Sequence, residues 1–373
     1  MRVCLISVEI FAWGKYGGFG RATRTIAGEL RRRGVDVTVV VPRVKRQPAQ
    51  QELDGIPIHA VKPQRWPSAI ELFRHVNADI YHSEEPSLGT YLAMRAMPER
   101  VHVITFRDTR DAHDWRTELS MPSLSSAQVL ANWLYEDNWL VRRAVRNADA
   151  LFAAAKFLIP KAKSKYNLKE TPQFLPTPVN IPARVEKAIE PTVCFISRWD
   201  RRKRPEIFFE LARSFPQVHF IAAGKSRDED WDRYLRAKYG QLPNLEIVGF
   251  IDQFQSDEIY NILSKSWILV NTAAREGLPN AFLEASAHRC AILSFVDPDG
   301  FSSQFGYHAS RDDFAHGLET LLSNDGWRAC GEKGYDYVSQ QFQRDIAIDQ
   351  HLAIYQRLCP GRPDHHQSLI EER

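Results

Sequence analysis

Cysteine is scarce and scattered in this chain. Its 373 residues include five cysteines, and no two of them form a C-x-x-C pair. A disulfide framework needs an even set and zinc sites use closely paired ligands, so we expect neither. We expect most of the cysteines to be buried apolar residues of a reduced, cytoplasmic protein. They are Cys4, Cys194, Cys290, Cys330 and Cys359.

Long apolar runs and a large charge excess are also missing. No window approaches 18 consecutive apolar residues, so we expect no transmembrane helix. The apolar start of the chain reaches a charge at Glu9, which is too early for the core of a signal peptide. The net charge of +3 is too small for a dedicated nucleic-acid binder. With 44% hydrophobic and 25% charged residues, the composition excludes a disordered chain or a coiled coil.

The pattern of elements indicates a parallel sheet in the first half of the chain. An apolar run at 3–8 is followed by clustered glycines, a helical pattern over 21–33 and a second apolar run at 35–41. Strand, loop, helix and strand in this order are typical of a βαβ unit. Three more strands are expected in this half, at 78–82, 101–106 and 150–154.

A proline-rich stretch over 175–191 has no helical periodicity and indicates a linker. Beyond it the rhythm restarts with a strand at 192–197 and a helix at 205–214. At roughly 150 residues per domain, the length also favours two domains. We therefore predict an α/β protein of two Rossmann-like domains, 1–180 and 181–340, whose parallel sheets face a central cleft. Further strands are expected at 218–223, 245–249, 268–271 and 291–294.

Gly17-Gly18-Phe19-Gly20 lies between the first strand and the first helix. Such a loop lets backbone N–H groups and a helix N-terminus approach a phosphate closely. Its spacing does not match G-x-G-x-x-G, and no acidic residue ends the second strand as a dinucleotide site requires. Two interpretations stay open: an anion-binding loop and a simple tight turn.

A dense basic segment follows the first strand of the second half. A phosphate or diphosphate would be favoured there, because ligands of open α/β sheets bind at the carboxyl ends of the strands. The alternative is a solvated basic turn, and the position favours the ligand-binding interpretation. The segment contains Arg198, Arg201, Arg202, Lys203 and Arg204.

Two glutamates flank a predicted helix start. Pro279 can begin a helix, so Glu276 lies in the preceding loop and Glu284 lies more than one turn inside, among apolar neighbours. A buried carboxylate needs hydrogen-bond donors, which sugar hydroxyls would supply. The alternative interpretation of this segment is an amphipathic helix in which Glu284 is exposed to solvent.

Together these features resemble the retaining glycosyltransferases of family four, or group 1, which have the GT-B fold. The glutamate pair of that family, E-x7-E, is matched by Glu276 and Glu284 within the pattern E-G-x-P-x-x-x-L-E-A. Its arginine and lysine five residues apart are matched by Arg198 and Lys203. The glycine loop near the chain start and the segment 244–250 resemble two further family motifs, so the resemblance covers nearly the whole chain.

The resemblance implies a role for each matching residue. Glu284 would hold the ribose hydroxyls of a nucleotide, and Glu276 would hold the hydroxyls of the donor sugar. Arg198 and Lys203 would neutralise the diphosphate as it leaves, which requires no metal or other cofactor. The last helix, at about 341–360, would pack back on the first domain. Other donor contacts would come from Gly17, Gly18, Gly249, Phe250, Gly277, Leu278, Pro279 and Asn280.

The chain departs from the family where a histidine is usual in the first domain. Here the stretch reads Thr105-Phe106-Arg107-Asp108, and Arg107 cannot act as a base near neutral pH. We expect Arg107 and Asp108 to contact the acceptor or the donor sugar. His82 matches an earlier family histidine on a strand end, and a hydrogen-bonded core histidine explains it at least as well.

Two weaker signals have ordinary explanations as well. Asp297-Pro298-Asp299 spells the D-x-D of metal-dependent GT-A enzymes, but a three-residue motif recurs by chance, and we expect no metal. The first 46 residues are locally basic, including Arg31-Arg32-Arg33. This face either touches an anionic membrane surface or a phosphorylated acceptor, or is a solvated helix end whose dipole favours cations.

We therefore predict a hexosyltransferase that moves a sugar from a UDP- or GDP-sugar to a glycan, a lipid-linked or a small-molecule acceptor. The family suggests polysaccharide or glycoconjugate biosynthesis and front-face displacement with retention. We expect no nucleic-acid partner and a cytoplasmic location, with peripheral membrane contact left open. There are two alternatives. One is a nucleotide-sugar-binding protein that has lost catalysis, which the absence of the usual histidine keeps open. The other is a GT-B sugar-nucleotide epimerase.

Overall fold

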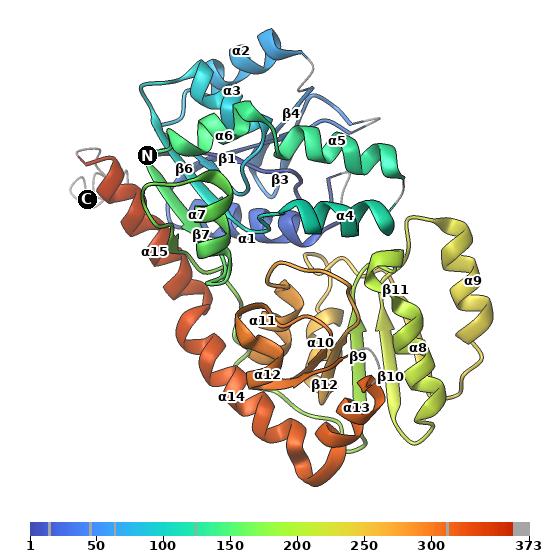
Figure 1. Cartoon of the computed structure of the whole chain (residues 1–373). Helices are drawn as coiled ribbons and strands as arrows, with labels where there is room; N and C mark the ends of the chain where they lie inside the picture. The colour runs from blue at the N-terminus through green and yellow to red at the C-terminus, as the bar shows by residue number, and fades with distance from the viewer. Residues whose placement is uncertain (14–15, 45–46, 63–64, 124, 311–312, 361–373) are drawn as a thin grey trace. The chain divides into compact units, whose positions relative to one another are not determined.

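The computed structural model describes residues 1–373 except 14–15, 45–46, 63–64, 124, 311–312 and 361–373 (Figure 1). The polar tail that follows the last helix in the sequence thus lies outside the described residues. Among those described, no helix is long and apolar enough to cross a membrane.

The first sheet has the strand order β3-β4-β2-β1-β5-β6-β7-β8 and is parallel except where β3 pairs with β4. Its near-continuous apolar strands are buried by helices on both faces, as a parallel sheet requires. One face packs on the cluster of Leu5, Ile26 and Val39, and the other on that of Cys4, Phe73 and Tyr81. The strands are β1 (Arg2–Ile6), β2 (Asp36–Pro42), β3 (Gln50–Leu53), β4 (Ile56–Val61), β5 (Ile80–Ser83), β6 (Val101–Phe106), β7 (Ala150–Ala153) and β8 (Gln173–Phe174).

The second sheet has the order β11-β10-β9-β12-β13-β14, and all its pairs are parallel. Its core contains Phe195, Phe208 and Phe220, with Trp327 stacked on Trp267 at 4.6 Å between ring centroids. Two parallel α/β sheets agree with the predicted fold class. The strands are β9 (Thr192–Ile196), β10 (His219–Ala223), β11 (Leu245–Gly249), β12 (Ile268–Asn271), β13 (Ala291–Ser294) and β14 (Gly306–His308).

The helices begin and end where local signals place them. Gly17 is the N-cap of α1, and Pro205 is the first residue of α8. The helices are α1 (Gly18–Arg32), α2 (Trp66–Val76), α3 (Leu88–Ala96), α4 (Ala112–Ser120), α5 (Ser126–Glu136), α6 (Trp139–Arg146), α7 (Leu158–Tyr166), α8 (Pro205–Ser214), α9 (Glu229–Tyr239), α10 (Glu258–Lys265), α11 (Asn280–Ala287), α12 (Phe301–Phe305), α13 (Phe314–Leu322), α14 (Gly326–Gln341) and α15 (Arg344–Leu358).

The chain divides into two compact units whose boundaries are not a single cut near residue 180. The first unit contains 1–109, 131–178 and 345–373, and the second contains 110–130 and 179–344. Residues 110–130, which carry α4, were expected in the first domain and group with the second unit instead. Ile348 and Tyr355 of α15 belong to the apolar core of the first unit.

Candidate active site

The second sheet brings two loops together where its topology changes direction. β9 lies between β10 and β12, so the chain leaves β9 for one side of the sheet and later returns to the other. Ligands of open α/β sheets bind at the carboxyl ends of strands at such a switch point. Here the loop after β9 carries Arg198 to Arg204, and the loop after β12 carries Thr272 to Pro279.

Hydrogen bonds hold the two loops against each other. The Nε of Arg204 donates to the carbonyl of Thr272 at 2.7 Å, and the hydroxyl of Thr272 donates to the carbonyl of Lys203 at 2.5 Å. Arg204 has a positive φ of 48°, and this left-handed residue ends the short 3-10 turn Arg201–Lys203 just before α8. The basic segment is therefore a fixed turn and not a free surface loop.

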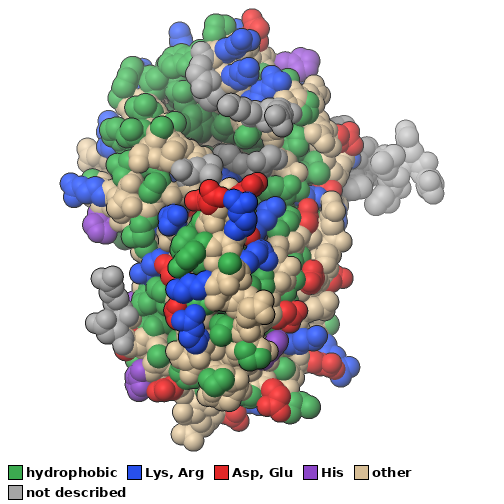
Figure 2. Space-filling model, turned by 90° about the vertical axis from the view of Figure 1, so that its right-hand side faces the viewer, with side chains coloured by type: hydrophobic (Ala, Val, Ile, Leu, Met, Phe, Trp, Pro, Cys, Tyr) green, Lys and Arg blue, Asp and Glu red, His purple; other side chains and the backbone are tan. Residues whose placement is uncertain are grey.

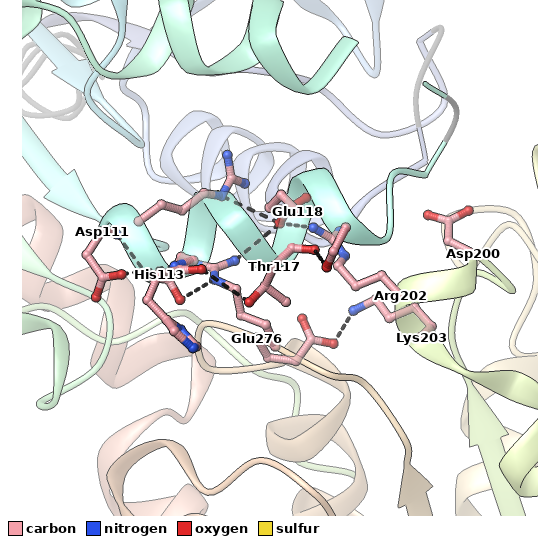
Figure 3. A network of polar contacts seen from close by, with 12 residues as sticks. Asp111, His113, Thr117, Glu118, Asp200, Arg202, Lys203 and Glu276 are labelled. Carbon is pink, nitrogen blue, oxygen red and sulfur yellow. Dashed lines mark hydrogen bonds and ion pairs between the residues drawn. The ribbon is translucent and has the colours of Figure 1, made fainter. Parts of the chain in front are cut away.

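Lys203 and Glu276 form an ion pair between these loops. The Nζ of Lys203 contacts Oε1 of Glu276 (Figure 3), and their side chains are 12% and 18% exposed. Burial lowers the pKa of the Lys203 ammonium, and the attraction of Glu276 opposes that shift. Arg198 lies 3.4 Å from the buried carboxylate of Asp200 and is 28% exposed. The three residues predicted to act on the donor thus come from the same two loops and keep some access to solvent.

Helix α4 contacts Arg202 and Arg275, the residues that directly precede Lys203 and Glu276 in the chain. Its Glu118 contacts Arg202, next to Lys203, and lies 3.5 Å from Arg275, next to Glu276. Asp114, one turn earlier, lies 2.7 Å from the Nε of Arg275. Figure 3 shows Glu118 on α4 with Arg202 directed toward it, beside the Lys203–Glu276 contact. Because all these residues belong to the second unit, α4 is part of the wall of this site.

Glu118 was not among the predicted site residues. Asp114 and Glu118 are four residues apart within α4, which places them on one helical face, and that spacing was the available signal. The arginine partners of Glu118 lie 84 and 157 residues further along the chain, so nothing near this face indicates what it contacts.

The start of α11 offers backbone donors beside Glu276. Pro279 is the N-cap and the helix begins at Asn280, so the positive end of the helix dipole lies at these residues, and the amide of Phe282 donates to the carbonyl of Pro279 at 3.0 Å. The residues from Gly277 to Asn280 are partly exposed, as is Glu284 in the second turn. A helix N-terminus of this kind favours an anionic ligand.

Gly249 ends β11 at the same edge of the sheet, and Phe250 follows it. The carbonyl of Gly249 accepts a hydrogen bond from the N–H of Gly224 at 2.6 Å. Gly224 has a φ of 142°, and a Cβ there would meet the carbonyl oxygen of Ser197. Phe250 is 39% exposed, with the ammonium of Lys225 5.4 Å from its ring centroid. An exposed aromatic ring therefore follows the carboxyl end of β11, two strands from β9, which precedes the basic turn.

The carboxylate of Glu9 lies against the glycine loop of the first unit. The N–H of Gly20 donates to Oε1 of Glu9 at 3.2 Å, and a Cβ on Gly17 would overlap that carboxylate. The N-terminus of α1, where Gly17 and Gly18 were predicted to contact the donor, is thus faced by a carboxylate of the chain itself. An anion-binding loop would require glycine at this position so that a phosphate can approach the backbone closely. A simple tight turn would also require glycine, because of the backbone conformation of the turn.

His82 is a core residue of the first unit. Its Nδ1 hydrogen-bonds with the hydroxyl of Tyr355 at 2.6 Å and its Nε2 with that of Thr105 at 2.8 Å. Burial lowers the pKa of His82 to about 4, although Glu84 opposes the shift. The imidazole is therefore neutral near pH 7 and both nitrogens are used, which favours the structural over the catalytic interpretation.

Arg107 and Asp108 lie in the same buried network. The Nε of Arg107 donates to Glu84 at 2.5 Å and its NH1 donates to Thr177 at 2.8 Å. The backbone N–H groups of Arg107 and Asp108 both donate to Glu85. Arg107 thus neutralises a buried carboxylate, and its guanidinium is not directed at solvent. Contact with an acceptor or a sugar stays a prediction for these residues.

Two acidic groups have structural roles in capping helices. Asp297, from the D-x-D letters, accepts hydrogen bonds from Ser302 and Ser303 at the start of α12. The ligand atoms of Asp111, His113 and Asp114 lie within 4.8 Å of one another. Asp111 and Asp114 form the capping box of α4, with both backbone–side-chain distances at 2.9 Å, so that capping accounts for their proximity.

Comparison with known proteins defines the class. Residues 180–336 match the family model of glycosyl transferases group 1, and residues 17–158 match that of the glycosyl transferase 4-like domain. The two matches together with the two-sheet architecture make this chain a glycosyltransferase of group 1 with the GT-B fold. No curated sequence is a significant match to it.

Solved structures share the architecture at low identity. A glycosyltransferase from Rickettsia africae ESF-5 is 15% identical, with 96% of this chain and 99% of that chain covered and a TM-score of 0.68. HepE from Anabaena, in complex with UDP-glucose, is 14% identical, with coverages of 95% and 99% and a TM-score of 0.68. The catalytic domain of starch synthase IV from Arabidopsis thaliana, bound to ADP and acarbose, is 12% identical, with coverages of 95% and 99% and a TM-score of 0.60. At these identities the likeness concerns the fold.

Proposed function

We propose that this protein transfers a sugar, with retention of configuration, from a UDP- or GDP-sugar to a glycan, a lipid-linked or a small-molecule acceptor. The observation that carries the proposal is the Lys203–Glu276 pair at the switch point of the second sheet, beside the N-terminus of α11. The UDP-glucose bound to the Anabaena structure supports a uridine nucleotide. Polysaccharide or glycoconjugate biosynthesis is the pathway class that we propose.

The charges of the site suit a diphosphate leaving group. Lys203 and Arg198 would lie against its oxygens, and the amides from Gly277 to Asn280 would add helix-terminal donors. Fixed cations and dipoles aimed at developing negative charge are the largest usual contribution to such catalysis. We therefore propose that the reaction needs no metal.

The carboxylates would orient the donor. Glu276 would accept hydrogen bonds from sugar hydroxyls, and Glu284 from the ribose hydroxyls. In the proposed step the bond between the anomeric carbon and the diphosphate oxygen breaks while the acceptor oxygen bonds to the same face of that carbon. The proton of the acceptor hydroxyl passes to the leaving phosphate. The site then needs no separate protein base, which agrees with the burial of both His82 and Arg107.

Ligand-dependent stability tests the donor site. Thermal unfolding would be followed with UDP-, GDP- and ADP-glucose in EDTA for wild type, Glu284→Ala and the exposed control Glu319→Ala. A ligand that binds the folded state at a hundredfold excess over its Kd adds about 2.7 kcal/mol of stability. We expect a shift with one nucleotide sugar that Glu284→Ala loses and the control keeps. A shift that requires metal, or none with any donor, would contradict the proposal.

Product analysis separates the alternatives. The anomeric configuration of the transferred sugar, read by proton NMR, distinguishes retention from inversion. Donor binding with neither transfer nor hydrolysis would favour the non-catalytic nucleotide-sugar-binding protein. Interconversion of the donor without any acceptor would favour the epimerase.

A further inference from the structure

The cations of the basic segment after β9 pair with acids of the second unit, and one pair is unlike the others. In three of the pairs the acid and the base have similar access to solvent. These are Arg201 with Asp228, Arg202 with Glu118, and Lys203 with Glu276. In the remaining pair the side chain of Arg198 is 28% exposed, whereas that of Asp200 is fully buried. A cation at the surface is thus held by an acid that solvent does not reach.

Ion pairs between two exposed side chains are ordinary features of this surface. Figure 2 shows Lys and Arg side chains with Asp and Glu side chains among them on one face of the molecule. Water screens such pairs, so they contribute little to stability. A buried carboxylate, by contrast, is costly unless a cation or hydrogen-bond donors compensate for its lost hydration. The pair of Arg198 and Asp200 therefore needs an explanation that the exposed pairs do not.

The carboxylate of Asp200 makes no hydrogen bond with any residue that the structure describes. Asp200 precedes the 3-10 turn Arg201–Lys203, where an aspartate often accepts from a backbone N–H, but its side chain does not cap this turn. Nη2 of Arg198 lies 3.4 Å from its Oδ2. Figure 3 shows Asp200 apart from the Lys203–Glu276 contact, so the two acids do not share one cation. The contact with Arg198 is therefore what this carboxylate provides.

Trp199 fixes the backbone on which Asp200 is carried. It is fully buried, and its N–H donates to the carbonyl of Lys225 at 3.1 Å. Its carbonyl accepts from the indole N–H of Trp231 at 3.0 Å. The carbonyl of Asp200 accepts from the N–H of Lys203 at 2.8 Å. A firmly held segment thus places the carboxylate, while its arginine partner keeps access to solvent.

Arg198 also lies near Lys203. Burial is the main cause that lowers the pKa of the Lys203 ammonium, and the positive charges of Arg202 and Arg198 lower it further. A guanidinium has five N–H donors in one plane, so it can bind a carboxylate along one edge and phosphate oxygens along another. Arg198 can therefore contact a phosphate beside Lys203 without releasing Asp200.

We propose that Asp200 is a positioning residue for the diphosphate of the donor. Its buried carboxylate holds one edge of the Arg198 guanidinium, so that another edge faces the phosphate oxygens. A donor group that is ordered before the ligand arrives does not have to be ordered during the reaction, which lowers the barrier. Because Asp200 acts through Arg198 on the leaving diphosphate, this role rests on the proposed function.

Asp200→Asn tests this role, because it removes the charge and keeps the shape of the side chain. Nucleotide release from UDP- and GDP-glucose would be measured with water and with a panel of mono- and oligosaccharides as acceptors, and the Kd of UDP and GDP by calorimetry. We expect kcat to fall by about ten- to a hundredfold. The Kd should stay within about threefold of wild type, because losing a negative charge near the phosphates offsets the lost orientation.

A double-mutant cycle shows whether Asp200 acts through Arg198. Arg198→Lys keeps the charge but loses the planar set of donors, so we expect it to lower kcat as well. The double variant should lose no more than Arg198→Lys alone. Additive losses in kcat would overturn the proposal. So would a kcat of Asp200→Asn within about threefold of wild type, or a Kd weakened as much as kcat, which a merely structural role would produce.

Two further variants make the test safe against misfolding. Asp200→Ser is smaller than asparagine and also suits the residue before a helical turn, so it should show the same split between kcat and Kd. Asp230→Asn changes an 86% exposed acid that pairs with Arg233, and it should match wild type in both quantities. If wild type releases no nucleotide from either donor, the proposed function fails and the role of Asp200 fails with it. If wild type is active and Asp200→Asn matches Asp230→Asn, only the role of Asp200 fails.

Discussion

Each unit of this protein holds charged residues at the carboxyl ends of its strands, but the two sets differ in access to solvent. In the first unit, Glu84 is fully buried and pairs with Arg107 beside His82. In the second unit, Lys203 and Glu276 pair while remaining partly exposed. We call Glu84, Arg107 and His82 the closed set, because they are buried, and Lys203 and Glu276 the open set, because they are partly exposed. Buried charges that pair with one another stabilise the fold, whereas partly exposed charges can exchange their internal partners for a ligand. The comparison supports the proposal that the donor binds to the second unit.

The largest expected effect comes from breaking the closed set. Glu84→Gln removes the carboxylate that neutralises Arg107, and removing one partner of a buried ion pair typically costs about 3–5 kcal/mol. Urea unfolding would measure this loss in the free energy of unfolding, with the exposed Glu319→Gln as a control that changes little. A loss below about 1 kcal/mol would show that the network is not a main source of stability.

The open set should respond in activity and not in stability. Lys203→Ala removes a cation from the proposed diphosphate site, and losing one such electrostatic contact lowers kcat by about 10²–10³-fold. The control is Lys265→Ala, an exposed lysine at the end of α10 in the same unit. Steady-state kinetics and thermal unfolding of both variants check this. Equal kinetics for the two variants would remove Lys203 from the mechanism.

A pH titration sharpens the difference within the first unit. Burial opposes the ionisation of Glu84, but Arg107 outweighs it and lowers the pKa of that carboxyl. Burial and the neighbouring Asp108 raise the pKa of Glu85 to about 7. A raised carboxyl pKa contributes stability that is present below its unfolded value, near 4.5, and is lost as the pH rises through 7.

Glu85→Gln should therefore gain stability relative to wild type between pH 4.5 and 7.5, by up to about 3 kcal/mol. Urea unfolding of both proteins at several pH values measures the difference. A constant difference across that range would mean that the pKa of Glu85 is not raised.

The smallest effect is expected at α4. Glu118→Gln keeps a hydrogen-bond acceptor for Arg202 and Arg275 but removes the charge, so we expect kcat to fall by about tenfold through displaced neighbours of the Lys203–Glu276 pair. The exposed Glu99→Gln serves as the control. In a double-mutant cycle with Arg202→Gln, the two losses should be less than additive. Full additivity would show that Glu118 acts independently of Arg202.

Local signals predicted the fold well, and distant contacts account for what they missed. The helix at 205–214 was predicted with its observed bounds because Pro205 marks its start. α1 begins at Gly18, earlier than expected, because its glycines serve as N-cap and first turn. The assignment of α4 to the second unit depends on its contacts with Arg202 and Arg275, which follow β9 and β12. No pattern within residues 110–130 predicts these contacts.

The candidate site was only partly predictable for the same reason. Residue types and spacing brought out Arg198, Lys203, Glu276 and Glu284. The structure places the first three in two loops at one sheet edge and Glu284 in α11, which follows the second loop. The burial of Arg107 could not be predicted, because it depends on Glu84 and Thr177 from separate segments. Glu9 lies directly after the first predicted strand. Its position was the signal from which a contact between its carboxylate and the glycine loop could have been predicted.

The division of the chain into units limits how the protein can be cut into pieces. The backbone passes between the two units four times, at 109/110, 130/131, 178/179 and 344/345. A fragment beginning at residue 181 would contain Arg202 and Arg275 without Asp114 or Glu118, and one ending at 180 would contain His82 without Tyr355. Neither half is therefore a self-sufficient module, and recombining domains between relatives at the proline-rich linker would separate partners that must be inherited together.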